Sequence, residues 1–121
     1  MSTIPVTDDV LDVAVEVLTV PDVAERLAVP VTRVHQMLRD HQLLALRRDG
    51  VIVVPTDFIH GDVVVKGLLG TMTVLRDGGY PDDQILRWLF TSDDSLPGTP
   101  VEALRADRGR EVKRRAQAMA F

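Results

Sequence analysis

The sequence predicts a mainly α-helical protein with one small β-hairpin, and three observations support this prediction. Two short stretches before residue 45 repeat apolar residues at helical spacing on either side of a tight turn. Asp49-Gly50 then separates two alternating runs, which is one of the strongest short hairpin signals. Beyond residue 60 the helical spacing returns, interrupted by clusters of Gly, Pro and Ser.

The first helix is expected to follow Thr19, a good N-cap residue, with Pro21 at an early helical position. Residues 13–18 alternate branched residues, which suits a short strand or an extended approach to this helix. A break at 28–30 precedes the second helix, at about 32–41, for which Thr32 is the expected N-cap. The inward residues of both helices are Val23, Ala24, Leu27, Val34, Met37 and Leu38.

The predicted hairpin has strands at 44–48 and 51–54, and Pro55 ends it. The second half predicts a three-helix region, with helices at 65–75, 81–89 and 100–119, and Gly109 bends or splits the last one. We expect Trp88 to lie in the core of this region, because it shares an apolar stripe with neighbouring aliphatic residues.

Composition narrows the class of protein. The chain has 121 residues, 45% of them hydrophobic, and no cysteine, which indicates a folded protein without disulfides or thiolate sites and suits the cytoplasm. No apolar run or signal peptide suggests a membrane. The phosphate-loop, dinucleotide, zinc-protease and nucleophile-elbow motifs are missing, so we expect no enzyme and no cofactor. His35 and His41 are six positions apart, which argues against a metal pair.

The formal net charge is −4, but the positive charge is concentrated in two islands. Residues 33–48 hold four arginines and one aspartate, and residues 101–121 hold six basic and three acidic side chains. Local positive charge, rather than the net charge, contacts phosphate groups.

Two short helices followed by a hairpin form a winged helix-turn-helix layout. In this layout the second helix enters the DNA major groove, and the hairpin is called the wing. The chain is therefore expected to bind double-stranded DNA and to regulate transcription, as a cytoplasmic, nucleoid-associated monomer or weak homodimer. Arg33 and Gln36 suit base edges, whereas Arg39 and the wing arginines suit phosphates. The full set of candidate DNA contacts is Thr32, Arg33, His35, Gln36, Arg39, Arg47 and Arg48. The plainer explanation of the helix residues is a polar face exposed to solvent. The plainer explanation of the hairpin arginines is that they keep an exposed hairpin soluble.

The stretch from Leu18 to Ile59 resembles the winged helix-turn-helix of excisionase/MerR-type proteins, through VAERL, the Leu-Leu exit and the wing ending in Val-Pro. That family usually has Gly where this chain has Ala28, so φ > 0 here would cost about 1 kcal/mol. The second half, with GGY, RWLF and RRAQAMAF, is similar to small actinobacterial winged-helix DNA-binding proteins. It is also weakly similar to the toxin-binding domain of Xre/MbcA/ParS-type antitoxins, which implies the alternative of a protein-interaction module that uses the C-terminal helices.

These patterns divide the chain into a flexible acidic leader at 1–12, a winged helix-turn-helix domain at 13–60 and a helical region at 61–121. Thr3 and Thr7 of the leader are candidate phosphorylation sites of a kinase substrate. A phosphate there would add about two negative charges beside aspartates and is expected to weaken DNA binding.

Overall fold

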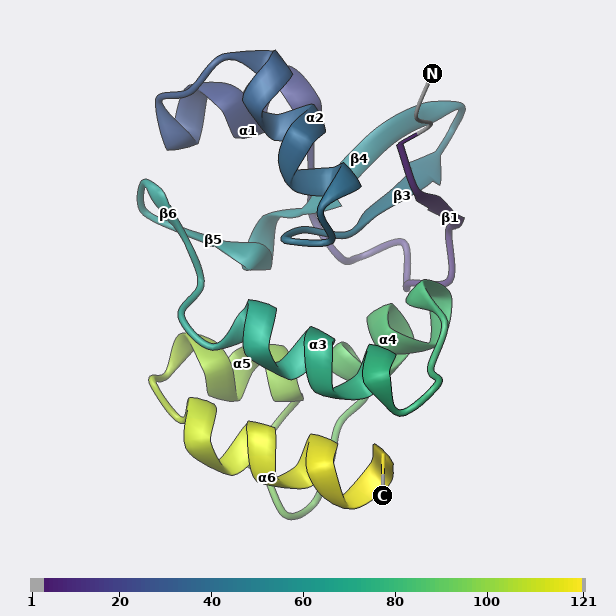
Figure 1. The fold of residues 1–121 in the computed structure, drawn as a ribbon, viewed down its shortest axis with the longest axis vertical. Helices are drawn as coiled ribbons and strands as arrows, with labels where there is room; N and C mark the ends of the chain where they lie inside the picture. The colour runs from purple at the N-terminus through teal and green to yellow at the C-terminus, as the bar shows by residue number, and fades with distance from the viewer. Residues whose placement is uncertain (1–3, 121) are drawn as a thin grey trace. The chain divides into compact units, whose positions relative to one another are not determined.

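The computed structural model describes residues 4–120, and the chain divides into two compact units between Val64 and Val65. Figure 1 shows the strands and the first two helices in the first unit and the remaining helices in the second. The division lies four residues after the boundary at 60/61 that the sequence predicts.

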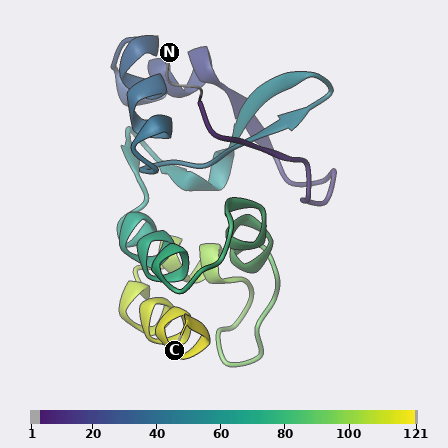
Figure 2. The ribbon, with the colours of Figure 1, turned by 45° about the vertical axis from the view of Figure 1, so that its right-hand side comes forward.

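The first unit is built on a four-stranded sheet of order β1-β3-β4-β2. Its strands and helices are β1 (Val6–Asp8), β2 (Val17–Thr19), α1 (Val20–Leu27), α2 (Val31–Arg39), β3 (Ala45–Arg48) and β4 (Val51–Pro55). The turn η1 (Thr56–Phe58) then leads to a second pair of strands, β5 (Ile59–His60) and β6 (Val63–Val64). The β3–β4 hairpin extends away from α1 and α2 in both views of the ribbon (Figures 1 and 2).

The local signals for α1 and the hairpin are confirmed. The Thr19 hydroxyl accepts a hydrogen bond from the backbone N–H of Asp22 at 3.3 Å, so Thr19 is the N-cap of α1. Asp49 and Gly50 have φ values of 53° and 79°, the left-handed pair that a two-residue type I′ turn requires. Ala28 ends α1 with φ 55° and ψ 45°, so it carries the strain that the missing glycine implies.

The start of α2 differs from the prediction. Pro30 is the N-cap residue and Val31 is the first helical residue, so Thr32 lies inside the first turn and does not cap the helix. Proline fixes φ near the value that extended backbone needs, which sets the direction of the chain just before the helix. The N-terminal N–H groups of α2 have no side-chain partner.

The predicted flexible leader at 1–12 contains a strand. Residues 6–8 form β1, which pairs in parallel with β3 from Val6 opposite Ala45 to Asp8 opposite Arg47. The backbone groups along that edge of β3 therefore bond to residues 6–8, which were predicted to lie in the leader and outside the domain. The first unit begins before residue 13 for this reason.

The second unit contains four helices among the described residues 65–120, where three were predicted. They are α3 (Leu68–Asp77), α4 (Asp82–Leu89), α5 (Pro100–Arg105) and α6 (Gly109–Ala120). The predicted last helix is interrupted at 106–108, where Asp107 has φ 62°, and Gly109 begins α6. A residue in the left-handed conformation does not continue an α-helix. The helix therefore breaks at Asp107, just before Gly109, the residue predicted to bend or split it.

Helix α4 buries Ile85, Leu86 and Leu89 completely, whereas Trp88 is half-buried. The predicted core position of Trp88 is therefore wrong. Leu86 is buried instead, since it lies three positions before the buried Leu89 and therefore on the same face of the helix. No described helix is long and apolar enough to cross a bilayer.

Candidate nucleic-acid interface

Helix α2 presents a polar face to solvent because its other face is anchored in the core. Val34, Met37 and Leu38 are buried, while Thr32, Arg33 and Gln36 are exposed. His35 and Arg39 are half-buried at the edge of this face. The guanidinium of Arg33 forms no hydrogen bond or ion pair with any of the described residues 4–120, so it is available to an anionic partner.

Gln36 is held in a hydrogen-bond network along α2. Its Nε2 donates to both carboxylate oxygens of Asp40, at 3.1 and 3.0 Å, and its Oε1 accepts from Nη2 of Arg39 at 3.3 Å. Residues three and four positions apart are neighbours on a helix, which allows this arrangement. An external partner of Gln36 would have to replace these bonds.

Arg47 is the exposed arginine of the wing. It lies on β3 opposite Ile52 of β4, one position before Arg48 and close to the Asp49-Gly50 turn. On its other side Asp8 of β1 is paired with it in register. A carboxylate one strand away lowers the local positive potential at this arginine.

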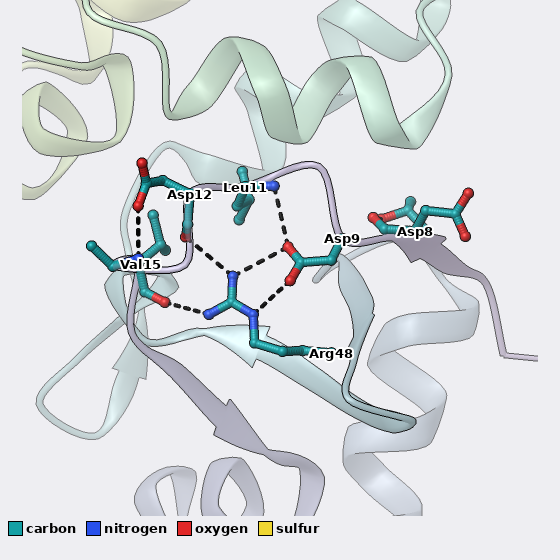
Figure 3. Close-up of polar contacts among 8 residues, drawn as sticks. Asp8, Asp9, Leu11, Asp12, Val15 and Arg48 are labelled. Atoms are coloured by element: carbon teal, nitrogen blue, oxygen red, sulfur yellow. Dashed lines mark hydrogen bonds and ion pairs between the residues drawn. The ribbon is translucent and has the colours of Figure 1, made fainter.

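Arg48 is not free for an external partner. As Figure 3 shows, its Nε and Nη2 bind the two carboxylate oxygens of Asp9 at 2.7 and 3.2 Å. Nη1 donates to the carbonyl oxygen of Val15 at 2.7 Å, and Nη2 also donates to that of Asp12 at 3.2 Å. The planar guanidinium suits this forked arrangement, and the side chain is only 14% exposed.

The ion pair with Arg48 sets the charge state of Asp9. The hydrogen bond from Arg48 lowers the pKa of the Asp9 carboxyl, and the backbone N–H of Leu11 also bonds this carboxylate and adds to the effect. The partner carboxylate in turn raises the pKa of Arg48. Both groups are therefore charged across the neutral range, and Arg48 ties residues 9–15 to the wing. A DNA contact of Arg48 would have to replace these bonds.

Only one of the two candidate phosphorylation sites lies within the described residues. Thr3 lies outside the described residues. Thr7 is the central residue of β1, where it pairs with Leu46, and its hydroxyl donates to the carbonyl oxygen of Asp8 at 2.9 Å. Sequence patterns do not reveal that Asp9 pairs with Arg48, because the two residues are 39 positions apart.

Comparisons with known proteins agree with this division of the chain. A family described as "DNA-binding protein Rv2175c, wHTH domain" matches residues 3–59, which include β1. A second family, described as "Rv2175c C-terminal domain of unknown function", matches residues 65–120. The four helices of the second unit thus fall within a domain that is distinct from the winged helix-turn-helix.

One relative is similar over the whole chain. It is the protein named "DNA-binding protein Rv2175c" from Mycobacterium tuberculosis (strain ATCC 25618 / H37Rv), 48% identical over 134 aligned positions that cover 100% of this chain and 92% of the relative. The NMR structure of Rv2175c matches with a TM-score of 0.88 at 47% identity, covering 99% of this chain and 91% of that one. With an exposed helix, a wing and both domain matches in sequence order, this chain belongs to the Rv2175c family, which combines a winged helix-turn-helix with a C-terminal domain of unknown function.

Proposed function

We propose that this protein binds double-stranded DNA, with α2 in the major groove and the wing on the sugar-phosphate backbone, and that it regulates transcription. The observation that carries the proposal is the exposed face of α2, where Thr32, Arg33 and Gln36 project from a helix whose opposite face is buried. The name of the relative, DNA-binding protein Rv2175c, supports the same activity.

The candidate residues divide into two roles. Arg33 and Gln36 face outward from the first two turns of α2, the part of a recognition helix that contacts base edges. An arginine can bond bidentately to guanine, and a glutamine to adenine. Arg39 at the end of α2 and Arg47 on the wing are proposed to contact phosphates, with His35 and Thr32 beside them.

The charge around this face sets how tightly DNA can bind. Residues 1–64 carry ten acidic and five basic side chains, and one of these bases, Arg48, is engaged by Asp9. Phosphate contacts therefore come from few arginines, and the acidic remainder of the unit repels any duplex that is bound elsewhere. This distribution favours one orientation of the DNA over non-specific contact.

The test is a duplex titration at fixed low salt, after selection of a preferred site from a random pool. Arg33→Ala is expected to weaken binding to the selected site by roughly 1–3 kcal/mol. Arg47→Ala is expected to weaken all duplexes alike and to reduce the salt slope by about one. Arg87→Ala, at an exposed arginine of α4, serves as the matched control. Equal losses for Arg33→Ala and Arg87→Ala would contradict the proposal.

Phosphorylation of Thr7 belongs to the same proposal. β1 pairs with β3, so a phosphate on Thr7 would add about two negative charges one residue away from the position opposite Arg47. The added charge would oppose the contact of the wing with the DNA backbone. A second proposal, a partner protein on the C-terminal helices, is favoured by Trp88, which is only half-buried, so that part of its aromatic side chain is open to a contact.

A further inference from the structure

The second unit contains a pocket that the proposed DNA contacts do not use. Its volume is about 640 Å³, and all of its lining comes from the start of α3, the start of α6 and the residues just before them. The lining residues are Lys66, Gly67, Gly70, Asp107, Gly109, Arg110 and Lys113. Sites for small molecules have volumes of about 300–1,000 Å³, so the pocket has room for one.

The charge of this pocket is positive. Three cations line it against one carboxylate, that of Asp107, in a chain whose formal net charge is −4. Lys66, Arg110 and Lys113 are exposed, and none of them forms an ion pair with a residue of the described range 4–120. The nearby Glu111 is already paired with Arg108. The three cations therefore outnumber the one carboxylate that lines the pocket, and none of the three is paired within the described range.

Helices α3 and α6 run parallel, side by side (Figures 1 and 2), and add to this charge. At their N-terminal ends, a Cβ built on Gly67 would lie 3.6 Å from the Cα of Gly109. At their C-terminal ends, a Cβ on Gly78 would lie 2.5 Å from that of Ala120. Both positive helix ends thus meet at the pocket, each equivalent to about half a charge.

Gly70 has no packing reason to be glycine. A Cβ at this position would meet nothing within 4 Å, whereas a Cβ at Gly67 would come within 3.1 Å of Leu104. Glycine inside a helix costs stability relative to alanine, by about 1 kcal/mol. Gly70 lines the pocket, so its missing side chain leaves space on the side where a ligand would lie.

We propose that this pocket binds a small phosphorylated molecule carrying at least two negative charges, such as a diphosphate. Lys66, Arg110 and Lys113 would neutralise the phosphates, and the backbone N–H groups at the start of α3, which has no side-chain cap, would donate to them. None of the described residues that line the pocket is aromatic, so recognition rests on the phosphates and not on base stacking. The concave shape favours a small ligand over the backbone of a DNA duplex.

The experiment is a titration of the ¹⁵N-labelled full chain with inorganic pyrophosphate at low ionic strength. The amide signals of Gly67, Gly70 and Gly109 are expected to shift together and to saturate. Lys113→Gln should weaken binding about tenfold, because a charged hydrogen-bond donor is lost. Arg114→Gln, at the next residue of α6 but outside the pocket lining, is the matched control and should change the affinity by less than about twofold.

A third variant separates binding from folding. Gly70→Leu fills the pocket without altering charge and places a good helix former in α3, so the melting temperature should rise while pyrophosphate binding falls at least about tenfold. Unmoved glycine signals, equal losses for Lys113→Gln and Arg114→Gln, or undiminished binding by Gly70→Leu would each overturn the proposal. A shift of the three glycines with a 20-base-pair duplex but not with pyrophosphate would also overturn it, by assigning the pocket to the DNA backbone.

Discussion

Single residues determine how the two helices of the first unit meet, and Ala28 is the clearest case. Its φ of 55° lies in the turn between α1 and α2, where only residues 28–30 separate the two helices. The backbone N–H of Ala28 donates to the carbonyls of Ala24 and Glu25, so the turn also satisfies the end of α1. The geometry needed at this position is the one that glycine adopts without strain.

Ala28→Gly is therefore expected to raise the free energy of unfolding by about 1 kcal/mol, since it removes the clash of Cβ with the backbone. Urea denaturation monitored by circular dichroism measures the change, with an unchanged dependence on urea concentration. Ala28→Val, with a branched side chain at the same φ, should lower the stability. A loss of stability in the glycine variant would show that the turn does not store this strain.

Arg48 and Asp9 predict a pH dependence. Because the folded pKa of Asp9 is lowered, its contribution to stability is complete above the unfolded value of about 4 and disappears as the pH falls through the lower folded value. Asp9→Asn should thus lower the melting temperature at pH 7 and have little effect near pH 2. Arg48→Ala should cost roughly 1–3 kcal/mol at pH 7, because four hydrogen bonds are lost. An equal effect of Asp9→Asn at both pH values would contradict the ion pair.

At the scale of elements, the sequence could predict α1, α2 and the wing because their signals are local. The cap at Thr19, the apolar spacing of α2 and the Asp49-Gly50 turn each act within a few positions. Strand β1 could not be predicted, since three residues show no periodicity and its pairing depends on β3, far along the chain. The role of Arg48 was missed for the same reason, because its partner lies 39 positions away.

The Gln36 network makes a prediction about α2. Asp40 holds the Gln36 amide with two hydrogen bonds and adds a negative charge to the exposed face. Asp40→Ala should release Gln36 and strengthen DNA binding several-fold, since no bond has to be exchanged and one repulsive charge is gone. Gln36→Ala should instead change which sequence is preferred. Both variants are compared by selection from a random duplex pool; an Asp40→Ala variant that binds more weakly would show that the network orders Gln36 for recognition.

Helix α4 makes a prediction about the second unit. Trp88 is half-buried while its neighbours Ile85 and Leu89 are fully buried, so Trp88→Ala removes only part of an aromatic contact. The expected loss is about 1–2 kcal/mol, against roughly 3–5 kcal/mol for a fully buried aromatic residue. Leu89→Ala should cost about 2–5 kcal/mol as the core comparison. Thermal and urea unfolding measure both, and a larger loss for Trp88→Ala than for Leu89→Ala would place the indole ring in the core.

At the scale of the whole molecule, the two units divide the charge unequally. The first carries an excess of acidic side chains around one basic helix face, whereas the second has nine basic and eight acidic side chains. One helix and one wing make few phosphate contacts, so a single copy should bind a duplex only modestly. Tight binding would require two copies on half-sites roughly 34 Å apart, which the stoichiometry of a titration reveals.

The central claim is that α2 and the wing contact DNA, and an amide chemical-shift titration of the ¹⁵N-labelled full chain with a selected duplex tests it most directly. The largest changes are expected in residues 31–39 of α2 and around Arg47 to Gly50 at the wing tip, with small changes in α4, where Arg87 lies. Changes confined to residues 65–120, or no change at low salt in a folded protein, would contradict the account.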